Sequence, residues 1–377
     1  MTMKRLAAWI LLAVMVLSGC ASGDSREGLG NGWQPEKTMA LEYAHEFRVD
    51  DYRGGYKLIS LADGSRFLVI PEGGKLPEGI AGDIAPLYQP IENIYLAATA
   101  AMCLFDGLGR ADAIRLSGTK AEGWYIDSAR KAMENGSMLY AGKYSEPDYE
   151  RILKEKCSLA VESTMIGHAS GVKEKLEELG IPVLIDQASH ESHPLGRTEW
   201  IKLYGALLNE EEKAQALFDR QVEYMEEAAA GEPTGKTVAF FYISSTGSAV
   251  VRKSGDYVSK MIELAGGEYI FHDLGDPEKS TSTVNLEMET FFAAAKDADV
   301  VIYNSAISGQ VESLTQLLER CPLLEQFKAV QTGDVWCTSQ NMYQEILQLG
   351  QMTKEFHQVF TTREPDSLEL DFLYRLK

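Results

Sequence analysis

Two stretches of this 377-residue chain alternate short apolar runs with segments of helical periodicity, and this alternation limits the possible folds more than any other feature. Strands and helices that alternate through short loops form a parallel sheet covered by helices. The sequence therefore predicts two α/β units. The first has helices over 94–104, 149–156 and 172–179 and strands over 113–116, 158–161 and 181–185. The second has strands over 238–243, 300–303 and 335–336 and helices over 257–264, 288–295, 314–320 and 344–360.

A long helical stretch separates the two α/β units. Apolar residues at helical spacing run from Trp200 to Leu207, and the acidic sequence 209–212 has the pattern of a helix N-cap and first turn. Helical periodicity then continues to about Ala230, where glycine and proline end it. We interpret residues 196–232 as a linking segment built on one continuous helix.

The two α/β units also match each other in order. Helix 149–156 and strand 159–161 correspond to helix 288–295 and strand 300–303, and a polar turn follows each strand. We therefore predict an α/β fold with two Rossmann-like α/β lobes, joined by a long linking helix, with a ligand cleft between the lobes. The predicted boundaries are 40–195 for the N-terminal lobe, 196–232 for the linking segment and 233–377 for the C-terminal lobe.

A β-hairpin is predicted within the N-terminal lobe, ahead of the α/β alternation. Residues 40–71 alternate apolar and polar side chains, and Asp63-Gly64 separates the runs 56–60 and 67–70. An Asp-Gly pair between two such runs is typical of a tight hairpin turn. We expect this hairpin to be an addition to the lobe.

The N-terminus carries an export signal. Lys4 and Arg5 precede the apolar run 7–17, which is too short to span a bilayer, and the sequence Leu-Ser-Gly-Cys ends at Cys20. This pattern resembles a bacterial lipoprotein signal with its lipobox, in which Cys20 becomes the lipidated first residue. The resemblance implies a signal peptide over 1–19, and the Gly- and Ser-rich residues 20–39 read as a flexible tether. An ordinary secretory signal is the alternative.

Composition excludes several functions. Without residues 1–19 the chain has 34 basic and 56 acidic residues, a net charge of −22, which repels nucleic acid. No later run approaches about 18 apolar residues, so no transmembrane helix is expected. Cys103 and Cys157 fit core positions, and Cys321 and Cys337 flank a segment that allows one disulfide.

Four short segments carry a family resemblance. They are 148–153 and 180–183 in the first lobe, and 266–271 and 298–302 in the second. In this order and spacing they resemble the substrate-binding lipoproteins of ABC importers, in the group that binds iron–siderophore, haem or cobalamin. The chain departs from the family pattern at Ala298 and at Cys157-Ser158, where the family has a proline and a proline–aspartate pair.

The resemblance implies a non-enzymatic receptor. Such a protein is lipid-anchored on the extracytoplasmic face of the cell membrane. It captures an iron chelate, haem or corrinoid, delivers it to an ABC permease with its ATPase, and holds no cofactor of its own. We expect a monomer that binds no nucleic acid.

Ligands of α/β lobes bind outside the carboxyl ends of the parallel strands. A large, planar or metal-chelated ligand needs aromatic walls and a few polar anchors. A basic residue there offsets the charge of an anionic chelate, and Arg252 fits that role. The predicted ligand-binding residues are Ser117, Trp124, Tyr125, Met165, His168, Tyr242, Arg252, Trp336 and Tyr343.

Three acidic residues fall near the starts of the two matching helices. Glu150 lies at the first, and Glu287 and Glu289 lie at the second. The family resemblance implies that one acidic residue on each lobe meets arginines of the permease. An acidic residue in a first helical turn also stabilises the helix dipole, which is the simpler interpretation.

Other functions find little support in the sequence. His190 and His193 are three residues apart and Pro194 follows, so they do not form the HExxH motif of a zinc enzyme. No nucleophile elbow, P-loop or dinucleotide-binding glycine pattern occurs, and we predict no catalytic residue and no metal site. A manganese or zinc receptor of the same fold and an extracellular lipoprotein enzyme remain the alternatives.

Overall fold

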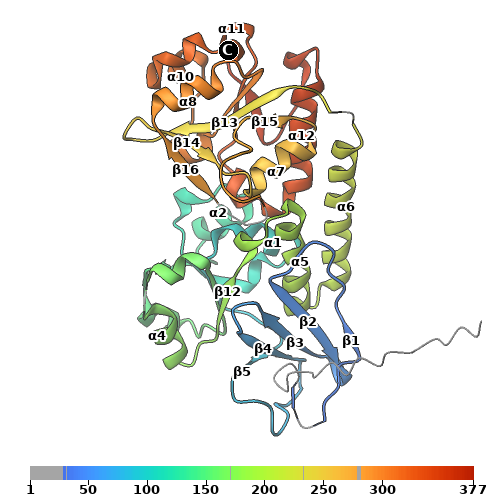
Figure 1. Ribbon diagram of the computed structural model, residues 1–377. Helices are drawn as coiled ribbons and strands as arrows, with labels where there is room; N and C mark the ends of the chain where they lie inside the picture. Colours follow the sequence, from blue (N-terminus) through green and yellow to red (C-terminus); the bar gives the residue numbers. More distant parts are fainter. Residues whose placement is uncertain (1–28, 31, 170, 232, 278–281) are drawn as a thin grey trace, which may run out of the picture.

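The computed structural model describes residues 29–30, 32–169, 171–231, 233–277 and 282–377. The predicted signal peptide and Cys20 lie outside these residues. Two α/β lobes stack along the long axis of the molecule, two helices run beside them, and a separate β-sheet forms the far end of the N-terminal lobe (Figure 1). No helix in these ranges is both long and apolar enough to cross a membrane.

The N-terminal lobe is built on a parallel sheet with strand order β12-β11-β6-β7-β8. Its first strand, β6, lies between β7 and β11, so the strand order reverses beside β6, as in Rossmann-like sheets. The strands are β6 (Ile94–Leu96), β7 (Ile114–Ser117), β8 (Leu139–Tyr140), β11 (Ala160–Ser163) and β12 (Val183–Asp186). The helices are α1 (Met102–Gly107), α2 (Asp127–Glu134), α3 (Tyr149–Lys154) and α4 (Val172–Glu178), and β9 (Gly142–Lys143) and β10 (Glu146–Pro147) form a small separate hairpin.

The predicted helix over 94–104 is wrong in its first half. Ile94, Tyr95 and Leu96 form the central strand β6 and are at most 1% exposed. A continuous apolar run gives the same signal in a buried strand and in a buried helix, so periodicity alone did not separate them. The helix begins only at Met102.

The C-terminal lobe repeats this arrangement in a seven-stranded mixed sheet. Strand β13 pairs in parallel with β17 on one side and with the short β15 on the other, so the strand order again reverses beside the first strand. The strands are β13 (Thr237–Ile243), β14 (Ala249–Arg252), β15 (Glu268–Tyr269), β16 (Thr283–Leu286), β17 (Val300–Tyr303), β18 (Val335–Thr338) and β19 (Leu373–Arg375). The helices are α7 (Tyr257–Leu264), α8 (Met288–Ala295), α9 (Ser305–Ser308), α10 (Leu314–Arg320), α11 (Lys328–Thr332) and α12 (Leu349–Thr361).

The linking segment is two helices and not the single continuous helix we predicted. Helix α5 (Pro194–Leu208) ends at Asn209, whose φ of 58° is left-handed, and α6 (Glu211–Ala229) begins beyond it. Asparagine tolerates this conformation better than most residues, so the chain turns there. Helix α5 is buried around almost its whole circumference, and α6 runs alongside it up to β13 (Figure 1). The connection between the lobes is therefore α6 alone.

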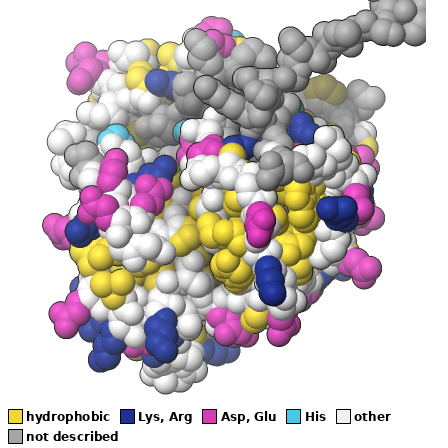
Figure 2. Space-filling view, turned by 90° about the horizontal axis from the view of Figure 1, so that it is seen from below, with side chains coloured by type: hydrophobic (Ala, Val, Ile, Leu, Met, Phe, Trp, Pro, Cys, Tyr) yellow, Lys and Arg dark blue, Asp and Glu magenta, His cyan; other side chains and the backbone are white. Residues whose placement is uncertain are grey.

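The predicted hairpin is the centre of a larger sheet. Strands β3 (Tyr56–Leu61) and β4 (Arg66–Ile70) pair in antiparallel register across the Asp63-Gly64 turn. The full order is β1-β2-β3-β4-β5, with β1 (Lys37–Thr38), β2 (Phe47–Tyr52) and β5 (Ile84–Tyr88). One face of this terminal sheet packs on the N-terminal lobe, and the other looks away from it at the end of the molecule (Figure 2).

The chain is packed against this terminal sheet well before residue 40. Leu29 is fully buried, the ring of Trp33 lies against Tyr52 and Tyr56, and the N–H of Glu36 donates to the carbonyl of Asp51. Residues 29–30 and 32–39 are thus part of the fold. The prediction of a flexible tether over 20–39 is therefore wrong for these residues, and its first part, 20–28, lies outside the described residues.

Two buried carboxylates fix the terminal sheet on α5. Glu199 accepts the backbone N–H groups of residues 42–44 at 2.8–3.1 Å, and Glu191 accepts those of residues 45–46 at 2.9–3.1 Å. Lys202 pairs with Glu199 at 2.8 Å. Buried carboxylates that accept several N–H groups are compensated for the loss of water, so this contact holds the sheet in one position.

Candidate functional site

The segment 339–348, with the short helices η8 (Met342–Gln344) and η9 (Ile346–Gln348), lies between the two lobes. The amide of Gln344 accepts the N–H of Tyr125 at 2.9 Å and donates to the carbonyl of Gly123 at 2.7 Å. The side chain of Gln340 donates to the carbonyl of Ser305 at 2.9 Å. This segment therefore joins the loop after β7 to the loop after β17, and both loops follow the carboxyl ends of parallel strands.

A buried polar cluster lies on the C-terminal side of this junction. Arg252, at the end of β14, is 8% exposed and pairs with Asp256 at 3.3 Å. Its guanidinium also donates to the hydroxyl of Tyr343 and lies 5.2 Å from the centroid of that ring. The side chain of Asn304, which follows β17, donates to the same hydroxyl at 2.7 Å. Asp256 and Tyr343 thus fix the guanidinium of Arg252 on the side of the C-terminal lobe that adjoins the segment 339–348.

Arg197 meets this cluster from the other side. Its guanidinium comes from the first turn of α5 and lies 4.0 Å from the centroid of the Tyr257 ring, at the start of α7. It donates to the carbonyls of Glu191 at 3.0 Å and Ser189 at 2.8 Å. We call the residues that meet here the interlobe seam: Tyr125, Arg197, Arg252, Asp256, Tyr257, Asn304, Tyr343 and Gln344.

The interlobe seam contains more positive than negative charge. Burial lowers the pKa of Arg197, whereas for Arg252 the effect of burial is outweighed by Tyr343 and Asp256, which hold its pKa above the ordinary value. Burial raises the pKa of Asp256, and Arg252 opposes that rise. A guanidinium stays protonated in proteins, so the seam residues include two positive charges and one aspartate, and the neighbouring Glu191 also acts on Arg197. The arrangement suits an anionic ligand, which forms charge-assisted hydrogen bonds with arginine.

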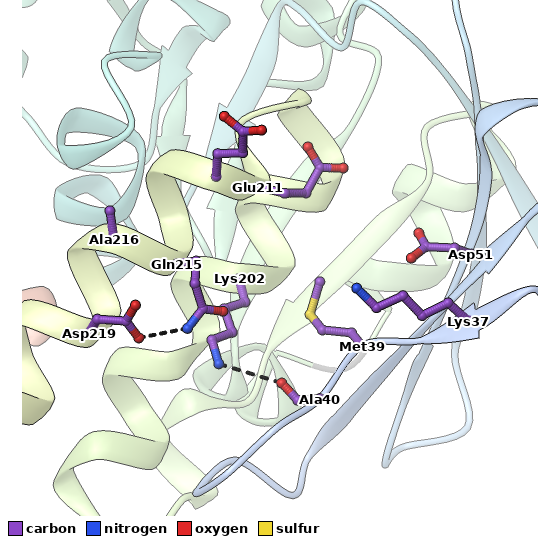
Figure 3. A pocket seen from close by; sticks show the side chains of 10 residues that line it. Lys37, Met39, Ala40, Asp51, Lys202, Glu211, Gln215, Ala216 and Asp219 are labelled. Carbon is purple, nitrogen blue, oxygen red and sulfur yellow. Dashed lines mark hydrogen bonds between the residues drawn. The ribbon is translucent and has the colours of Figure 1, made fainter.

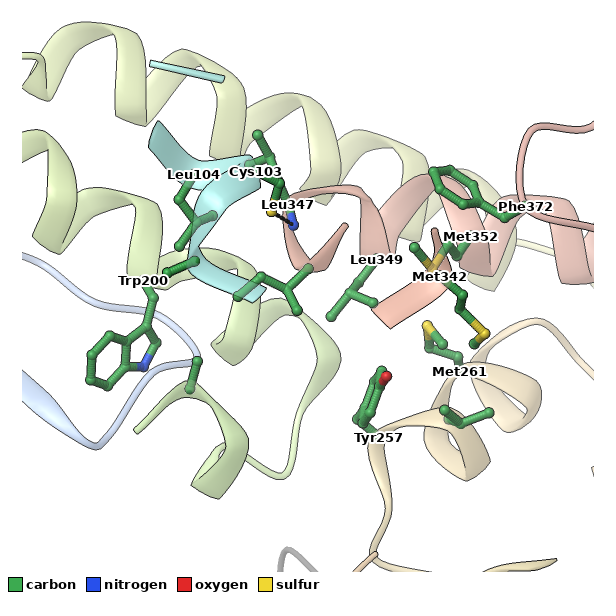
Figure 4. Close-up of a cluster of buried hydrophobic side chains, with 14 of the residues drawn as sticks. Cys103, Leu104, Trp200, Tyr257, Met261, Met342, Leu347, Leu349, Met352 and Phe372 are labelled. Carbon is green, nitrogen blue, oxygen red and sulfur yellow. Dashed lines mark hydrogen bonds between the residues drawn. The ribbon is translucent and has the colours of Figure 1, made fainter. Parts of the chain in front are cut away.

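An apolar core from both lobes lies beneath the seam. Figure 4 shows Tyr257 and Met261 of α7 near Met342 and Leu349, with Leu347 between them and Cys103 of α1. The N–H of Leu347 approaches the sulfur of Cys103 at 3.4 Å. This continuous packing resists large separation of the lobes, because opening would expose apolar surface.

The structure brings three of the predicted ligand-binding residues together at the seam. Arg252 and Tyr343 are in direct contact, and Tyr125 is bonded to the adjacent Gln344. Tyr125 is 47% exposed, and its hydroxyl also reaches Gln340 at 3.3 Å. Arg197 and Gln344 also lie at the seam, although they were not among the predicted ligand-binding residues. Arg197 gave one usable signal, a basic residue in the first turn of a helix that opens after the last strand of a lobe.

Three other predicted ligand-binding residues are buried. Ser117 is fully buried, and its hydroxyl accepts the indole N–H of Trp124 at 3.2 Å and donates to the carbonyl of Thr119 at 2.6 Å. Trp124 and Trp336 are each 2% exposed. The indole of Trp336 donates to Asp334, which precedes β18 at its amino end, away from the seam. Both tryptophans were predicted as cleft walls, but burial places them in the core.

The remaining predicted ligand-binding residues lie at strand ends outside the seam cluster. Met165 and His168 are exposed on the 3-10 helix that follows β11. Tyr242 is half-buried near the end of β13 and lines a cavity of about 520 Å³ with Ser244, Ile307 and other residues. These positions border the carboxyl ends of the strands, as the fold rule requires.

A cavity of about 660 Å³ lies elsewhere, between α6 and the terminal sheet. Figure 3 shows Lys37 and Asp51 of the sheet on one side and Glu211, Gln215 and Asp219 of α6 on the other. Its residues are mostly charged and it is distant in the fold from the strand ends. We regard it as a solvent-filled gap between two packed elements.

The described residues contain no group of three or more His, Cys, Asp or Glu side chains placed to hold a metal ion. The two histidines of the 190–193 segment have separate environments. His193 caps α5 through its Nδ1, which accepts the N–H of Leu195 at 3.2 Å, and its ring stacks on Tyr43. Burial lowers the pKa of His193 to about 4, so it is neutral in this role. His190 lines a different cavity, of about 430 Å³.

The three acidic residues predicted to meet a permease are exposed on helix starts. Glu150 lies in the first turn of α3, where Asp148 caps the helix by accepting the N–H of Arg151 at 3.0 Å. Glu287 is the N-cap residue of α8 and Glu289 lies in its first turn. Helices α3 and α8 precede β11 and β17, the corresponding strands of the two lobes.

Comparisons with known proteins identify the fold. The chain is 27% identical to an uncharacterized lipoprotein of Methanocaldococcus jannaschii, over 91% of this chain and 89% of that protein. A second uncharacterized lipoprotein of the same organism is 25% identical, over 88% of this chain and 81% of that protein.

Solved structures agree at lower identity. The periplasmic haem-binding protein HutB of Vibrio cholerae superposes with a TM-score of 0.57 at 19% identity, over 70% of this chain and 98% of that one. An ABC-type Fe³⁺-hydroxamate transport system protein of Saccharomonospora viridis gives 0.56 at 19% identity, over 72% and 94%. The model of the periplasmic binding protein family matches residues 105–342. The chain therefore belongs to the periplasmic binding protein family, whose members are solute-binding proteins.

Proposed function

We propose that this chain is the membrane-anchored receptor of an ABC importer, and that it captures an anionic iron chelate or haem between its lobes. The observation that carries the proposal is the presence of two guanidinium groups at the interlobe seam, where Arg197 lies on Tyr257 and Arg252 pairs with Asp256. The aromatic rings of Tyr125, Tyr257 and Tyr343 add flat surface around them. Catecholate, hydroxamate and porphyrin ligands combine planar groups with negative charge.

The ligands of structural relatives support the same class. A haem-binding protein and an Fe³⁺-hydroxamate transport protein share this fold. A corrinoid is the third ligand class to test. It is large and planar, but its binding should depend less on the two arginines. A bare manganese or zinc receptor is not favoured, since the seam offers guanidinium groups and not metal ligands.

Binding measurements on purified protein test the ligand class. We expect a panel of ferric siderophores, haem and cobalamin to give one saturable binder, seen by isothermal titration and by its visible absorbance bands. Arg252→Gln and Arg197→Gln should each weaken an anionic chelate about 10- to 100-fold, since a charge-assisted hydrogen bond contributes about 1.5–3 kcal/mol. Arg130→Gln is the matched control, because Arg130 is exposed on α2 and pairs only with the surface residue Asp127.

Other results from the same panel would contradict the proposed ligand site or ligand class. Binding that both seam variants leave unchanged places the ligand elsewhere. Binding of cobalamin alone, insensitive to both arginines, selects the corrinoid class. Turnover of any ligand to a new product would make the protein an extracellular lipoprotein enzyme instead.

Membrane anchoring through a lipid on Cys20 is the second part of the proposal. The lipobox sequence that ends at Cys20 is the main evidence for this anchor, and the two relatives named as lipoproteins support it. The mature N-terminal peptide should carry acyl chains at Cys20 by mass spectrometry. Cys20→Ala should leave an uncleaved precursor or release protein into the medium, and an unmodified mature N-terminus at another residue would contradict the anchor.

Docking on the permease is the third part. Glu150 on one lobe and Glu287 with Glu289 on the other lie at equivalent helix starts, so a two-subunit permease with basic residues on both subunits can meet them together. Reversing all three to lysine should impair uptake into proteoliposomes and leave ligand affinity unchanged. The control reverses Glu134, Glu223 and Glu364, which are also exposed. Equal uptake by both triple variants would remove the docking role.

A further inference from the structure

The outer face of the terminal sheet carries an apolar surface at the end of the molecule. Leu58, Leu68, Ile70 and Ile84 point to this face, while the alternate residues of the same strands pack on the N-terminal lobe. Figure 2 looks onto this end, where hydrophobic side chains gather in the middle of the face and most charged side chains lie around them. A sheet that is apolar on both faces needs a covering on the second one.

Within the part of the chain that the structure describes, the covering of this face is thin. Leu29 and Trp33 lie over the sheet from one side, and the loop between β4 and β5 lies over it from the other. The hydroxyl of Tyr56 fixes that loop by donating to the carbonyl of Lys75 at 2.8 Å and accepting its N–H at 3.1 Å. We call the partly exposed residues here the apolar end face: Trp33, Tyr56, Ile80, Ala81 and Tyr88, together with Leu76, which follows Lys75 in the same loop.

The apolar end face keeps large side chains exposed to solvent. Leu76 is 42% exposed and Tyr88 is 53% exposed. Tyr88 is the register partner of Ile70, so it points to the same side of the sheet. Arg53 lies over the ring of Trp33, 4.9 Å from its centroid. Tryptophan, tyrosine and a nearby arginine beside aliphatic residues are the composition of protein surfaces at the membrane–water interface.

The chain reaches this face directly from its proposed lipid anchor. Cys20 and Leu29 are nine positions apart in the sequence, and nine residues span at most roughly 30 Å. Leu29 is fully buried in the cluster beneath the apolar end face. Acyl chains on Cys20 would therefore hold Leu29, and with it this end of the molecule, within roughly 30 Å of the bilayer.

We infer that the apolar end face rests on the surface of the phospholipid bilayer, as a contact separate from permease docking. This inference depends on the proposed lipid anchor at Cys20. Contact is made by apolar and aromatic side chains, since the net charge of −22 after removal of residues 1–19 opposes attraction to anionic lipids. The terminal sheet, which precedes the family-matched residues 105–342, is the part of the chain that makes this contact.

Trp33 provides a specific probe for the test. Beyond the signal peptide the chain has four tryptophans, and Trp124, Trp200 and Trp336 are at most 2% exposed, whereas Trp33 is partly exposed on the apolar end face. The lipidated protein is reconstituted in phosphatidylcholine vesicles with and without bromine on the acyl chains, which quenches tryptophan by contact. We expect quenching to remove the contribution of Trp33, so that the quenched spectrum matches that of Trp33→Phe.

Variants test the surface itself. Leu76→Ser with Ile80→Ser should reduce quenching of Trp33, and Leu153→Ser with Ile307→Ser should not, although Leu153 and Ile307 are 47% and 51% exposed elsewhere. Vesicle flotation is measured in parallel. Protein that floats with the vesicles while Trp33 stays unquenched overturns the inference and leaves the anchor intact. Protein that does not float refutes the anchor, and the inference fails with it. A dimer in detergent, with Trp33 unquenched in vesicles, assigns the face to a second copy and also overturns the inference.

Discussion

The guanidinium of Arg197 lies 4.0 Å from the centroid of the Tyr257 ring, and this contact joins α5 to α7 across the interlobe seam. The two residues are 60 positions apart in the sequence. Arg197 is held by two backbone carbonyls on one side and by the aromatic face on the other. Its orientation toward the seam therefore depends on a residue of the opposite lobe.

Tyr257→Leu should weaken binding of the anionic chelate by about 3- to 10-fold, because a partly desolvated cation–π contact contributes on the order of 1 kcal/mol and orients the guanidinium. Tyr257→Phe keeps the aromatic face and should bind nearly as well as the wild type. Isothermal titration of both variants checks this. Equal loss in the two variants would assign the effect to the hydroxyl and not to the ring.

Glu162 makes stability depend on pH. This residue of β11 is fully buried, and burial raises its pKa from 4.5 to about 8. Between these values the folded protein keeps a proton that the unfolded chain releases. The contribution of Glu162 to the free energy of unfolding is therefore fully present below about pH 4.5, and it is lost as the pH rises toward 8.

The variant Glu162→Gln isolates this effect. The free energy of unfolding of the wild type minus that of the variant should fall by about 1.4 kcal/mol per pH unit within that window. Urea titrations at several pH values measure it. A flat difference for Glu162→Gln would show that the carboxyl is ionised in the folded protein.

Glu199→Ala should destabilise the protein by about 3–5 kcal/mol, since it leaves Lys202 buried without its carboxylate and the N–H groups of residues 42–44 without an acceptor. Hydrogen exchange should rise first in residues 39–46. Glu223→Ala on the exposed side of α6 is the control and should change stability by less than about 0.5 kcal/mol. If urea denaturation gives both variants the same free energy of unfolding, Glu199 does not hold the terminal sheet on α5.

The four cysteines beyond Cys20 should titrate as thiols. Cys103, Cys157, Cys321 and Cys337 are all free in the structure, including the pair considered for a disulfide. Burial raises the pKa of Cys157 to about 11 and that of Cys337 to about 12, so the native protein should react slowly with a thiol reagent. In denaturant without reductant, four equivalents are expected. Two equivalents would indicate a bond between Cys321 and Cys337.

Local patterns predicted several elements to the residue. Helices α7, α8 and α10 and strand β17 have the bounds expected from the sequence. These elements carry their own signals, such as Asp256, whose side chain accepts the N–H of Val258 at the start of α7. The two-lobed fold followed from their order, because alternating strands and helices allow few arrangements.

The positions of individual side chains were predicted less well. Trp124 and Trp336 lie near strand ends, yet both rings are buried, and their indole N–H groups donate to Ser117 and to the partly exposed Asp334. A strand buried on both faces shows no alternation, so the sequence does not tell which side chain points to the cleft. Arg252 and Tyr343 were predicted as separate candidates, and only the fold shows that they touch.

The sequence by itself determined the kind of lobes and their number, since the strands and helices that build them follow from residues that are neighbours in the chain, and it predicted the export signal. The tertiary structure decided the break at Asn209, the packing of residues 29–30 and 32–39 on the terminal sheet, and the contact of Arg197 with Tyr257. These features depend on which distant surfaces bury one another. Burial free energy is summed over the whole fold, so it selects partners that no local pattern encodes.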